Sequence, residues 1–471
     1  MRALRFALAL ATSATLAACA LTAPPAAPEL APQARPNLTT PSTWSTPGTA
    51  SGAVGDRWLA AFNDRALDAL VVEALAYNAD LRVAAARVDQ AAAYVTLAGG
   101  TLYPQVMLLA RGGGKMSGDS SGLQGMGLIA SWELDLWGRV RAGRAAAQSQ
   151  YASAALDTEY ARQSMAALTA KSWFLATEAL QQKALAESML RSAERLLALT
   201  RDRVRVGQSS DYDLALAQAN ALTYRDAVAQ LELARQQALR AIEVLVGRYP
   251  AANLAVPAQL PELSASVPAG MPSELLERRP DVIAAERRVA AAFYSTEQAK
   301  AARLPQISLS ANLTSLSSDL FVLQNRDNPV ASAGASLLAP IFLGGQLQSQ
   351  VEIKTAEQKL AIADYGRIST RAFAEVESAL AAGVAADSRE TILVQAVNHR
   401  QRALEHSLSR YRVGSNDLRA VTQDELGLYS ARSARLRVQA ERLVQRVNLH
   451  LALGGNFDAS TALDTTAPAT P

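Results

Sequence analysis

Histidine, cysteine and carboxylate side chains, which supply most metal sites and much enzyme chemistry, are poorly grouped in this sequence. His399, His406 and His450 have no second cysteine or carboxylate at the spacing that a metal site needs. All three are expected on helices, where His399 and His406 share a face, and we interpret them as solvated surface residues. The sequence therefore predicts no metal centre, no cofactor and no catalytic residue, and we expect that the protein is not an enzyme.

One glycine-rich run has the composition of a phosphate-binding loop but not its pattern. It reads Arg111-Gly-Gly-Gly-Lys115, with Leu109 where the first glycine is required and Met116 in place of Ser or Thr. We interpret the run as a strand end and a loop. The formal net charge is only +3, without a basic tail, so nothing favours nucleic acid as a partner.

The amino terminus has the features of an export signal. Met1-Arg-Ala-Leu-Arg5 is cationic, and the apolar run that follows is too short to span a bilayer. It ends in Leu-Ala-Ala before Cys19, the only cysteine, at the position of a lipobox cysteine. We predict that residues 1–18 are a lipoprotein signal peptide and that Cys19 carries acyl chains such as palmitate, which would anchor the chain to lipid. The alternative is an ordinary signal peptide cut at a small-residue site.

The segments at the two ends of the mature chain differ in composition from the rest. Residues 19–55 are rich in Pro, Ala, Ser and Thr, so we predict a lipid-anchored, extended tether with little regular structure. Residues 456–471 are predicted to be a disordered tail.

Between these segments the sequence contains an internal duplication. Glu73-Ala-Leu-Ala-Tyr-Asn-Ala-Asp80 corresponds to Glu274-Leu-Leu-Glu-Arg-Arg-Pro-Asp281 at an offset of 201 residues (274 − 73). Arg205-Val-Gly207 corresponds to Arg412-Val-Gly414 at an offset of 207 residues (414 − 207). An internal duplication of this length fixes the architecture. The two predicted structural repeats are residues 56–260 and 261–455.

Each repeat is predicted to contain a hairpin of strands, at about 104–134 and about 305–340. After Pro305, apolar residues from Ile307 to Leu313 alternate with small polar residues, which is the period of a strand. Strands of about ten residues have the length of a tilted membrane-spanning strand. A small soluble sheet is the alternative, but such a sheet normally turns Lys and Glu to water. These strands carry Ser, Thr, Gly and Asn instead.

A hairpin of long helices is predicted after each pair of strands, at about 139–247 and about 347–453. The longer helices would extend on the order of 100 Å. Gly207 and Gly414 fit the left-handed residue that ends a helix, and Asp211 and Asp417 fit caps of the helices that follow. The predicted fold is therefore mainly α with a transmembrane β part.

Four membrane strands cannot form a closed barrel. An open edge in hydrocarbon leaves unpaired N–H and C=O groups, at a cost of several kcal/mol each. At least two copies must therefore pool their strands, and their helical hairpins would then form a ring of helices around the same axis. Such an assembly is a conduit. Trp132 and Trp137 are predicted at the membrane interface, or in the packing where the barrel meets the helices.

Short segments spread over nearly the whole mature chain carry a family resemblance. They are Trp58-Leu-Ala-Ala-Phe62, Ala79-Asp-Leu-Arg-Val83, Tyr103-Pro-Gln105, Trp132-Glu-Leu-Asp-Leu-Trp-Gly-Arg139, Arg278-Arg-Pro-Asp281, Pro340-Ile-Phe-Leu-Gly-Gly345, Tyr411-Arg-Val-Gly414 and Leu451-Ala-Leu-Gly-Gly455. In order and spacing they resemble TolC-type outer-membrane efflux proteins, specifically the lipoprotein branch (NodT/OprM-like outer-membrane factors).

The resemblance implies an architecture and a set of partners. A homotrimer would place twelve strands in one outer-membrane barrel and twelve helices in a periplasmic α-barrel. A periplasmic adaptor and an inner-membrane pump, often of the resistance–nodulation–division (RND) type, would deliver small molecules such as drugs to this exit duct. Outer-membrane lipids are the remaining expected partner.

The turns of the helical hairpins are the expected gate and adaptor contact, as in that family. Asp213 aligns with the gating carboxylate and Tyr411 with an aromatic residue beside it. Asn416 stands where TolC places an arginine, so we hypothesise that Arg412 takes over the pairing with Asp211 and Asp213. The residues expected to contact the adaptor are Arg205, Gly207, Gly414, Asn416 and Asp417.

Two other functions remain open at this point. The same fold serves as the outer-membrane channel of type I protein secretion, which neighbouring genes for an ATP-driven exporter would favour. A non-conducting structural lipoprotein of the envelope is the other alternative.

Overall fold

The computed structural model describes residues 21–47, 52, 54–111, 124–263, 267–317 and 330–456. The predicted signal peptide, Cys19, Lys115, Met116 and all but the first residue of the predicted tail lie outside the described residues. The chain forms two compact units. One comprises Met1–Leu38, Ala84–Asp157 and Asp281–Thr370, and the other comprises Thr39–Val83, Thr158–Pro280 and Arg371–Pro471. The units do not follow the two repeats, because each repeat contributes segments to both.

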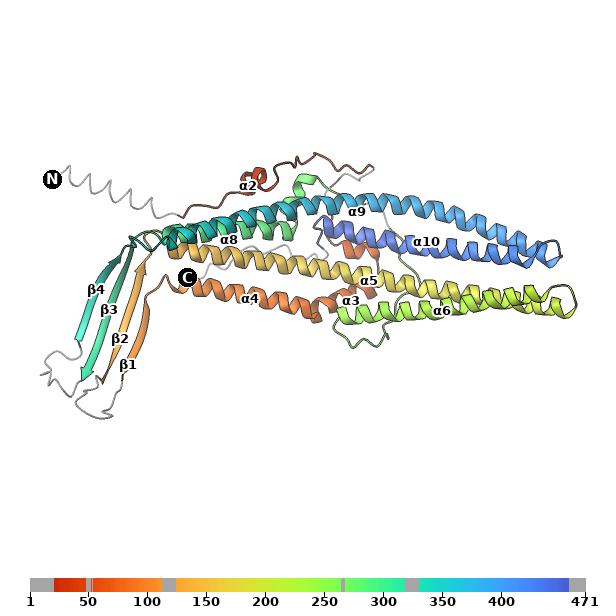
Figure 1. Ribbon diagram of the computed structural model, residues 1–471, viewed down its shortest axis with the longest axis horizontal. Helices are drawn as coiled ribbons and strands as arrows, with labels where there is room; N and C mark the ends of the chain where they lie inside the picture. The colour runs from red at the N-terminus through yellow and green to blue at the C-terminus, as the bar shows by residue number, and fades with distance from the viewer. Residues whose placement is uncertain are drawn as a thin grey trace. The chain divides into compact units, whose positions relative to one another are not determined.

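The first unit contains one antiparallel sheet in the order β1-β2-β3-β4 (Figure 1). Its strands are β1 (Gln105–Arg111), β2 (Gln124–Leu134), β3 (Gln306–Ser317) and β4 (Val330–Leu338). All four fall inside the ranges predicted for the two hairpins. Because β2 pairs with β3, the hairpins of the two repeats join into one sheet, which ends at β1 on one side and β4 on the other.

The strand register separates an apolar face from a small polar face. One row across the sheet is Leu108, Leu128, Leu313 and Ala331, and the adjacent row is Met107, Ile129, Asn312 and Ser332. Rows like the second carry Ser308, Ser310 and Thr314 of β3 and Gly334 and Ser336 of β4, whereas Ser315 falls on the opposite face. The irregular alternation of β1 and of Ile129 also has its explanation here, because Met107, Leu109 and Ile129 lie on this mainly polar face.

Among the described residues, five helices contribute to the first unit. They are α2 (Ala27–Ala34), most of α4 (Ala79–Gly100), nearly all of α8 (Pro280–Ala301) and the first parts of α5 (Arg139–Arg205) and α9 (Gln346–Arg412). Helix α2 lies against α9, where Leu30 is buried and the guanidinium carbon of Arg35 lies 5.9 Å from the ring centroid of Tyr365. The expectation of an extended tether with little regular structure is therefore wrong for Ala27–Ala34, because α9 offers this segment a helix surface on which to bury Leu30.

The second unit contains η1 (Trp58–Phe62), α3 (Arg65–Tyr77), α6 (Asp211–Leu245), η2 (Pro272–Glu274), α7 (Leu275–Arg278), α10 (Leu418–Ala452) and the remaining parts of α5 and α9. Its largest core surrounds Phe62, Trp173 and Phe174. Trp173 also donates its indole N–H to Asp64 Oδ2 at 2.8 Å. Asp64 also caps α3, so its carboxylate links the start of this helix to the core around Trp173.

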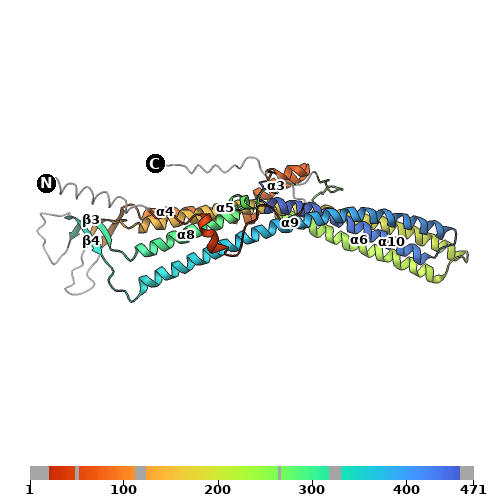
Figure 2. The same ribbon diagram turned by 90° about the horizontal axis from the view of Figure 1, so that it is seen from above.

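Helices α5 and α6 form one hairpin and α9 and α10 the other, and their two turns lie next to each other in both views (Figures 1 and 2). Polar pairs connect α5 to α10 along their length. Lys171 binds Asn448, Gln182 binds Ser433, and Ser192 binds Glu425. Along these pairs the residue numbers rise in α5 and fall in α10, so the two helices run antiparallel. We call this contact between the hairpins, with its buried residues Leu196, Ala217, Leu418, Val421 and Leu428, the hairpin seam.

Candidate functional site at the helical hairpin turns

The two turns have the same backbone geometry. Gly207 follows the end of α5 with φ of 73°, and Gly414 follows the end of α9 with φ of 79°. The next residue in each turn, Gln208 or Ser415, donates its backbone N–H to a carbonyl in the preceding helix, at 2.8 and 2.9 Å respectively. A positive φ in this position is favourable for glycine because it has no Cβ. The duplication seen in the sequence thus extends to the backbone of both turns.

The helices after the turns are capped by different residues. Ser210 caps α6, and its hydroxyl accepts the backbone N–H of Asp213 at 3.1 Å. Asp211, which we expected to be the cap, is instead the first residue of α6. Asp417 does cap α10, where it accepts the N–H of Ala420 at 2.8 Å. The prediction is therefore confirmed for Asp417 and wrong for Asp211, because a serine one residue earlier takes the capping position.

Asp213 is held in its ionised form by the turn itself. Hydrogen bonds from the backbone N–H and hydroxyl of Ser210 and from the hydroxyl of Ser209 lower the pKa of the Asp213 carboxyl group below its usual value, despite some desolvation. The positive charge of Arg419 lowers this pKa further. The carboxylate predicted from the resemblance therefore carries a stable negative charge at the turn.

Arg419 is a residue that the sequence reasoning missed. Its guanidinium carbon lies 5.7 Å from the ring centroid of Tyr212, next to Asp213. Arg412, the predicted partner of Asp213, is exposed and forms no ion pair within the described part of one chain. The signal for Arg419 was its position in the first turn of α10, opposite the first turn of α6.

Tyr411 lies in the hairpin seam. It is only 4% exposed, and its hydroxyl lies 3.3 Å from Thr200 Oγ1. Arg203, which the sequence reasoning also missed, donates to the carbonyl oxygen of Tyr411 at 2.9 Å and places its guanidinium carbon 4.5 Å from the ring centroid. These contacts give Tyr411 the role of joining the two hairpins directly behind their turns.

The remaining predicted turn residues divide into exposed and internally bonded ones. Arg205 is exposed and pairs with Asp202 at 3.1 Å. Asn416 donates to Ser407 Oγ at 2.9 Å, so its side chain stabilises its own turn.

Two valines, Val206 and Val413, occupy equivalent places in the two repeats and are 62% and 78% exposed. Exposed aliphatic side chains at both turns offer apolar contact area to a partner.

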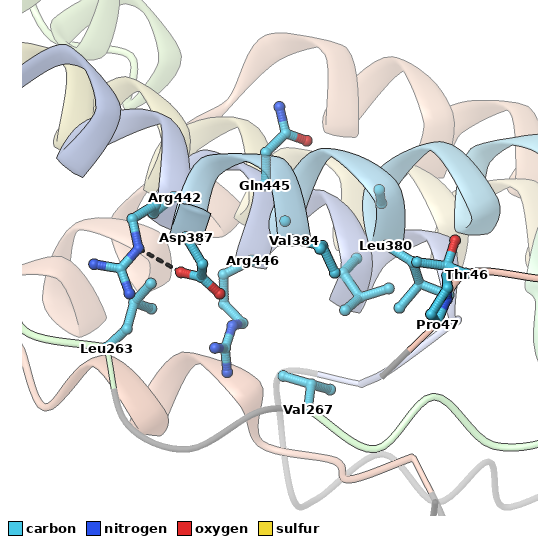
Figure 3. A pocket seen from close by; sticks show the side chains of 13 residues that line it. Thr46, Pro47, Leu263, Val267, Leu380, Val384, Asp387, Arg442, Gln445 and Arg446 are labelled. Carbon is cyan, nitrogen blue, oxygen red and sulfur yellow. Dashed lines mark hydrogen bonds and ion pairs between the residues drawn. The ribbon is translucent and has the colours of Figure 1, made fainter. Parts of the chain in front are cut away.

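A small cavity elsewhere in the second unit lies between α9 and α10 (Figure 3). Leu380, Val384 and Leu263 supply apolar walls, and an ion pair between Arg442 Nε and Asp387 Oδ1 at 2.6 Å closes one side. Burial lowers the pKa of the neighbouring Arg446. No nucleophile and base come together among these lining residues, so the cavity gives no support to an enzymatic function.

Trp132 and Trp137 lie at the base of the sheet in the first unit. Trp132 donates its indole N–H to the carbonyl of Leu102 at 2.9 Å, and Trp137 donates to that of Pro305 at 2.7 Å. These carbonyls precede β1 and β3, so both rings pack where strands meet helices. Since the rings are also 36% and 51% exposed, this packing is compatible with a place at the membrane interface.

The histidines agree only in part with the sequence interpretation. His399 and His406 are exposed, as predicted. His450 is 6% exposed and stacks on Trp58 with ring centroids 5.8 Å apart, so the surface interpretation is wrong for it. Burial lowers the pKa of His450 to about 4, which keeps it neutral.

The described residues contain neither a metal-binding group nor a membrane helix. No three His, Cys, Asp or Glu side chains within them converge at metal-binding distance. No helix in the same ranges combines the length and the hydropathy that crossing a bilayer requires.

Comparison with known proteins agrees with this architecture. The family model described as outer membrane efflux protein matches residues 70–248 and 271–455. The pyoverdine export outer membrane protein OpmQ of Pseudomonas putida is 31% identical over 95% of this chain and 97% of its own length. The cation efflux system protein CusC of Escherichia coli is 30% identical over 85% of this chain and 88% of its own length.

A solved structure gives the same result for the fold. The outer-membrane channel OprN superimposes with a TM-score of 0.80 at 27% identity, covering 90% of this chain and 99% of that one. Members of this family are outer-membrane channel proteins and not enzymes, as the sequence predicted. With its duplicated hairpins, its four-stranded sheet and a family match to each repeat, the chain belongs to the outer membrane efflux protein family.

Proposed function

We propose that three copies of this chain form an exit duct in the outer membrane for small molecules, within a tripartite efflux system. The observation that carries the proposal is the four-stranded sheet with one apolar and one small polar face. Its edges, β1 and β4, need partners in hydrocarbon, and neighbouring copies supply them. Pyoverdine export and cation efflux, named for OpmQ and CusC, are both exports of small solutes.

Loss of the protein tests this function directly. We expect a strain without it to become several-fold more susceptible to part of a panel of dyes, detergents, antibiotics and metal ions, and the wild-type gene to restore resistance. An unchanged panel together with loss of a secreted protein would favour the type I secretion alternative. Purified protein that conducts no ions, even with its turns loosened, would favour the structural lipoprotein.

A lipid anchor at Cys19 fits the position of the first described residues. A Cβ added to Gly138, in the turn after β2, would lie 3.2 Å from Cδ2 of Leu21. Cys19 precedes Leu21 by two residues, a reach of about 7 Å at most. An acylated Cys19 would thus attach near the base of the sheet, where lipid begins. We expect Cys19→Ser to abolish incorporation of labelled palmitate, and persistent labelling would contradict the anchor.

The hairpin turns are proposed as the periplasmic gate and the contact for an adaptor protein of an inner-membrane pump, which the family resemblance assigns to the RND type. Three copies would bring Asp211, Asp213 and Arg412 around one axis, where Arg412 of one copy pairs with a carboxylate of the next. The apolar side chains of Val206 and Val413, with the backbone at Gly207 and Gly414, would meet the adaptor. Arg205, Asn416 and Asp417 complete this surface.

Neutralising Asp213 should open the gate. We expect Asp213→Asn to raise the single-channel conductance of the purified protein in planar bilayers, because it removes the fixed charge from the proposed latch. The same change also weakens the first turn of α6, so Asp417→Asn is the matched control for α10. Equal conductance of Asp213→Asn and wild type would remove Asp213 from the latch.

A further inference from the structure

A carboxyl group is buried in the hairpin seam, away from the turns. Glu425 is 2% exposed and lies on α10, about two helical turns from its start. Its Oε1 accepts a hydrogen bond from Ser192 Oγ of α5 at 2.8 Å. Its other oxygen, Oε2, is buried without a hydrogen-bond partner among the described residues.

Two further oxygen atoms near the hairpin seam are also buried without a hydrogen-bond partner in the described part of the chain. The hydroxyl groups of Tyr224 on α6 and of Thr422 on α10 are also buried without partners within the described ranges. Tyr224 is 2% exposed and interacts electrostatically with Glu425. Its ring makes an edge contact with the ring of Tyr429, with the two centroids 5.5 Å apart. A buried carboxylate oxygen without a donor among the described residues is costly, because no protein group there replaces the hydration that it loses.

Few charged groups face this carboxyl group. Arg195 of α5 acts on it electrostatically, and Glu425 in turn acts electrostatically on the Tyr224 hydroxyl group of α6. Arg400 of α9 lies against Gly427 on α10. Desolvation raises the pKa of Glu425, and Ser192, Arg195 and Asn220 offset this only in part.

We propose that Glu425 is a proton-sensitive lock in the hairpin seam, tightened by protonation and loosened by ionisation. A neutral carboxyl group no longer carries a buried charge, and its protonated oxygen becomes a hydrogen-bond donor. The lock connects α10 to both helices of the other hairpin, so its state changes how firmly the two hairpins hold together.

The direction of the pH dependence follows from linkage. A loosened seam hydrates Glu425 and returns its pKa toward the ordinary value of about 4.3. Because the packed seam has the higher pKa, it binds the proton more tightly, and acid favours it. The stabilisation therefore grows as the pH falls through the raised pKa and is complete below the ordinary one. Neutral and alkaline conditions leave the seam strained and easier for a partner to separate.

Amide hydrogen exchange of the purified full chain tests the lock without any assumption about conduction. The readout is the protection of peptides covering Asn220–Tyr224 and Glu425–Tyr429, corrected for the intrinsic pH dependence of exchange. We expect wild-type protection to rise several-fold between about pH 8 and about pH 5, with the full effect reached only below the ordinary carboxyl pKa of about 4.3. Glu425→Gln should hold the high protection at both pH values.

Two variants complete the test. Glu405→Gln removes a negative charge from an exposed site on α9 and should behave as wild type. Ser192→Ala removes a hydrogen bond to the charged form, so its transition should move to higher pH, which gives a result even if Glu425→Gln folds poorly. Protection that does not change with pH in wild type, or that changes equally in Glu425→Gln, would overturn the lock.

The consequence for transport rests on the proposed duct. If the turns open when the hairpins separate, wild-type conductance should fall in acid while that of Glu425→Gln stays low and independent of pH. Absence of conductance in every variant, with the exchange result intact, would refute the duct and leave the lock standing. Conductance that responds to pH equally in wild type and Glu425→Gln would instead separate the lock from gating.

Discussion

Replacing Arg279 by methionine should destabilise the second unit by about 3 kcal/mol, at the lower end of the range for removing one partner of a buried ion pair. The Arg279 side chain is 2% exposed, and Nη1 donates to Glu375 Oε2 at 2.8 Å and to the carbonyl oxygen of Ala452 at 3.1 Å. Methionine fills much of the volume but leaves the carbonyl at the end of α10 without its donor. The expected loss of unfolding free energy stays at the lower end of that range because Glu375 is partly exposed and keeps Arg371 as a second ion-pair partner at 2.8 Å.

The neighbouring arginine provides the matched control. Arg278 pairs with Asp56 at 3.0 Å, but the two side chains are 31% and 57% exposed, so this pair contributes less than about 1 kcal/mol. Urea unfolding of the detergent-solubilised protein, followed by far-ultraviolet circular dichroism, compares Arg278→Met with Arg279→Met. Equal midpoints for the two variants would show that the buried network is not what makes Arg279 important.

The regular parts of the fold were predictable because their signals are local and repeated. Constant offsets between the halves located both pairs of strands and both helical hairpins, and glycine at 207 and 414 located both turns. Local signals also explain the small error at the α6 cap, where Ser210 and Asp211 are adjacent residues that both cap helices well. Neighbouring capping residues compete, and only the backbone geometry selects one.

The missed features depend on residues that are distant in sequence. Arg419 and Asp213 come from different repeats, and Tyr411 and Arg203 meet only when the hairpins pack. His450 has the sequence environment of an exposed helix residue, yet Trp58 covers it from almost 400 positions earlier. Helical periodicity describes one helix at a time, so it identifies candidate faces but not the partners that bury them.

A single methyl group added at Gly366 should release α2 from α9. A Cβ there would overlap the carbonyl oxygen of Ala34 and lie 2.8 Å from its carbonyl carbon. Backbone atoms cannot rotate away as a flexible side chain can, so Gly366→Ala forces the whole helix off its site. Release exposes Leu30, at a cost of about 1.5–3 kcal/mol, and separates Arg35 from Tyr365.

Amide exchange within Ala27–Ala34 measures this release, and we expect Gly366→Ala to lose nearly all protection there. Gly383→Ala is the matched control, because Gly383 lies in the same helix with open space at its Cβ position. That control should leave α2 in place and strengthen α9 by up to about 1 kcal/mol through helix propensity. Unchanged protection in Gly366→Ala would mean that α2 is not seated on α9. Loss of protection in Gly366→Ala alone would show that the segment following Cys19 packs on α9. The proposed lipid anchor would then be attached to a segment docked on the helices and not to a flexible linker.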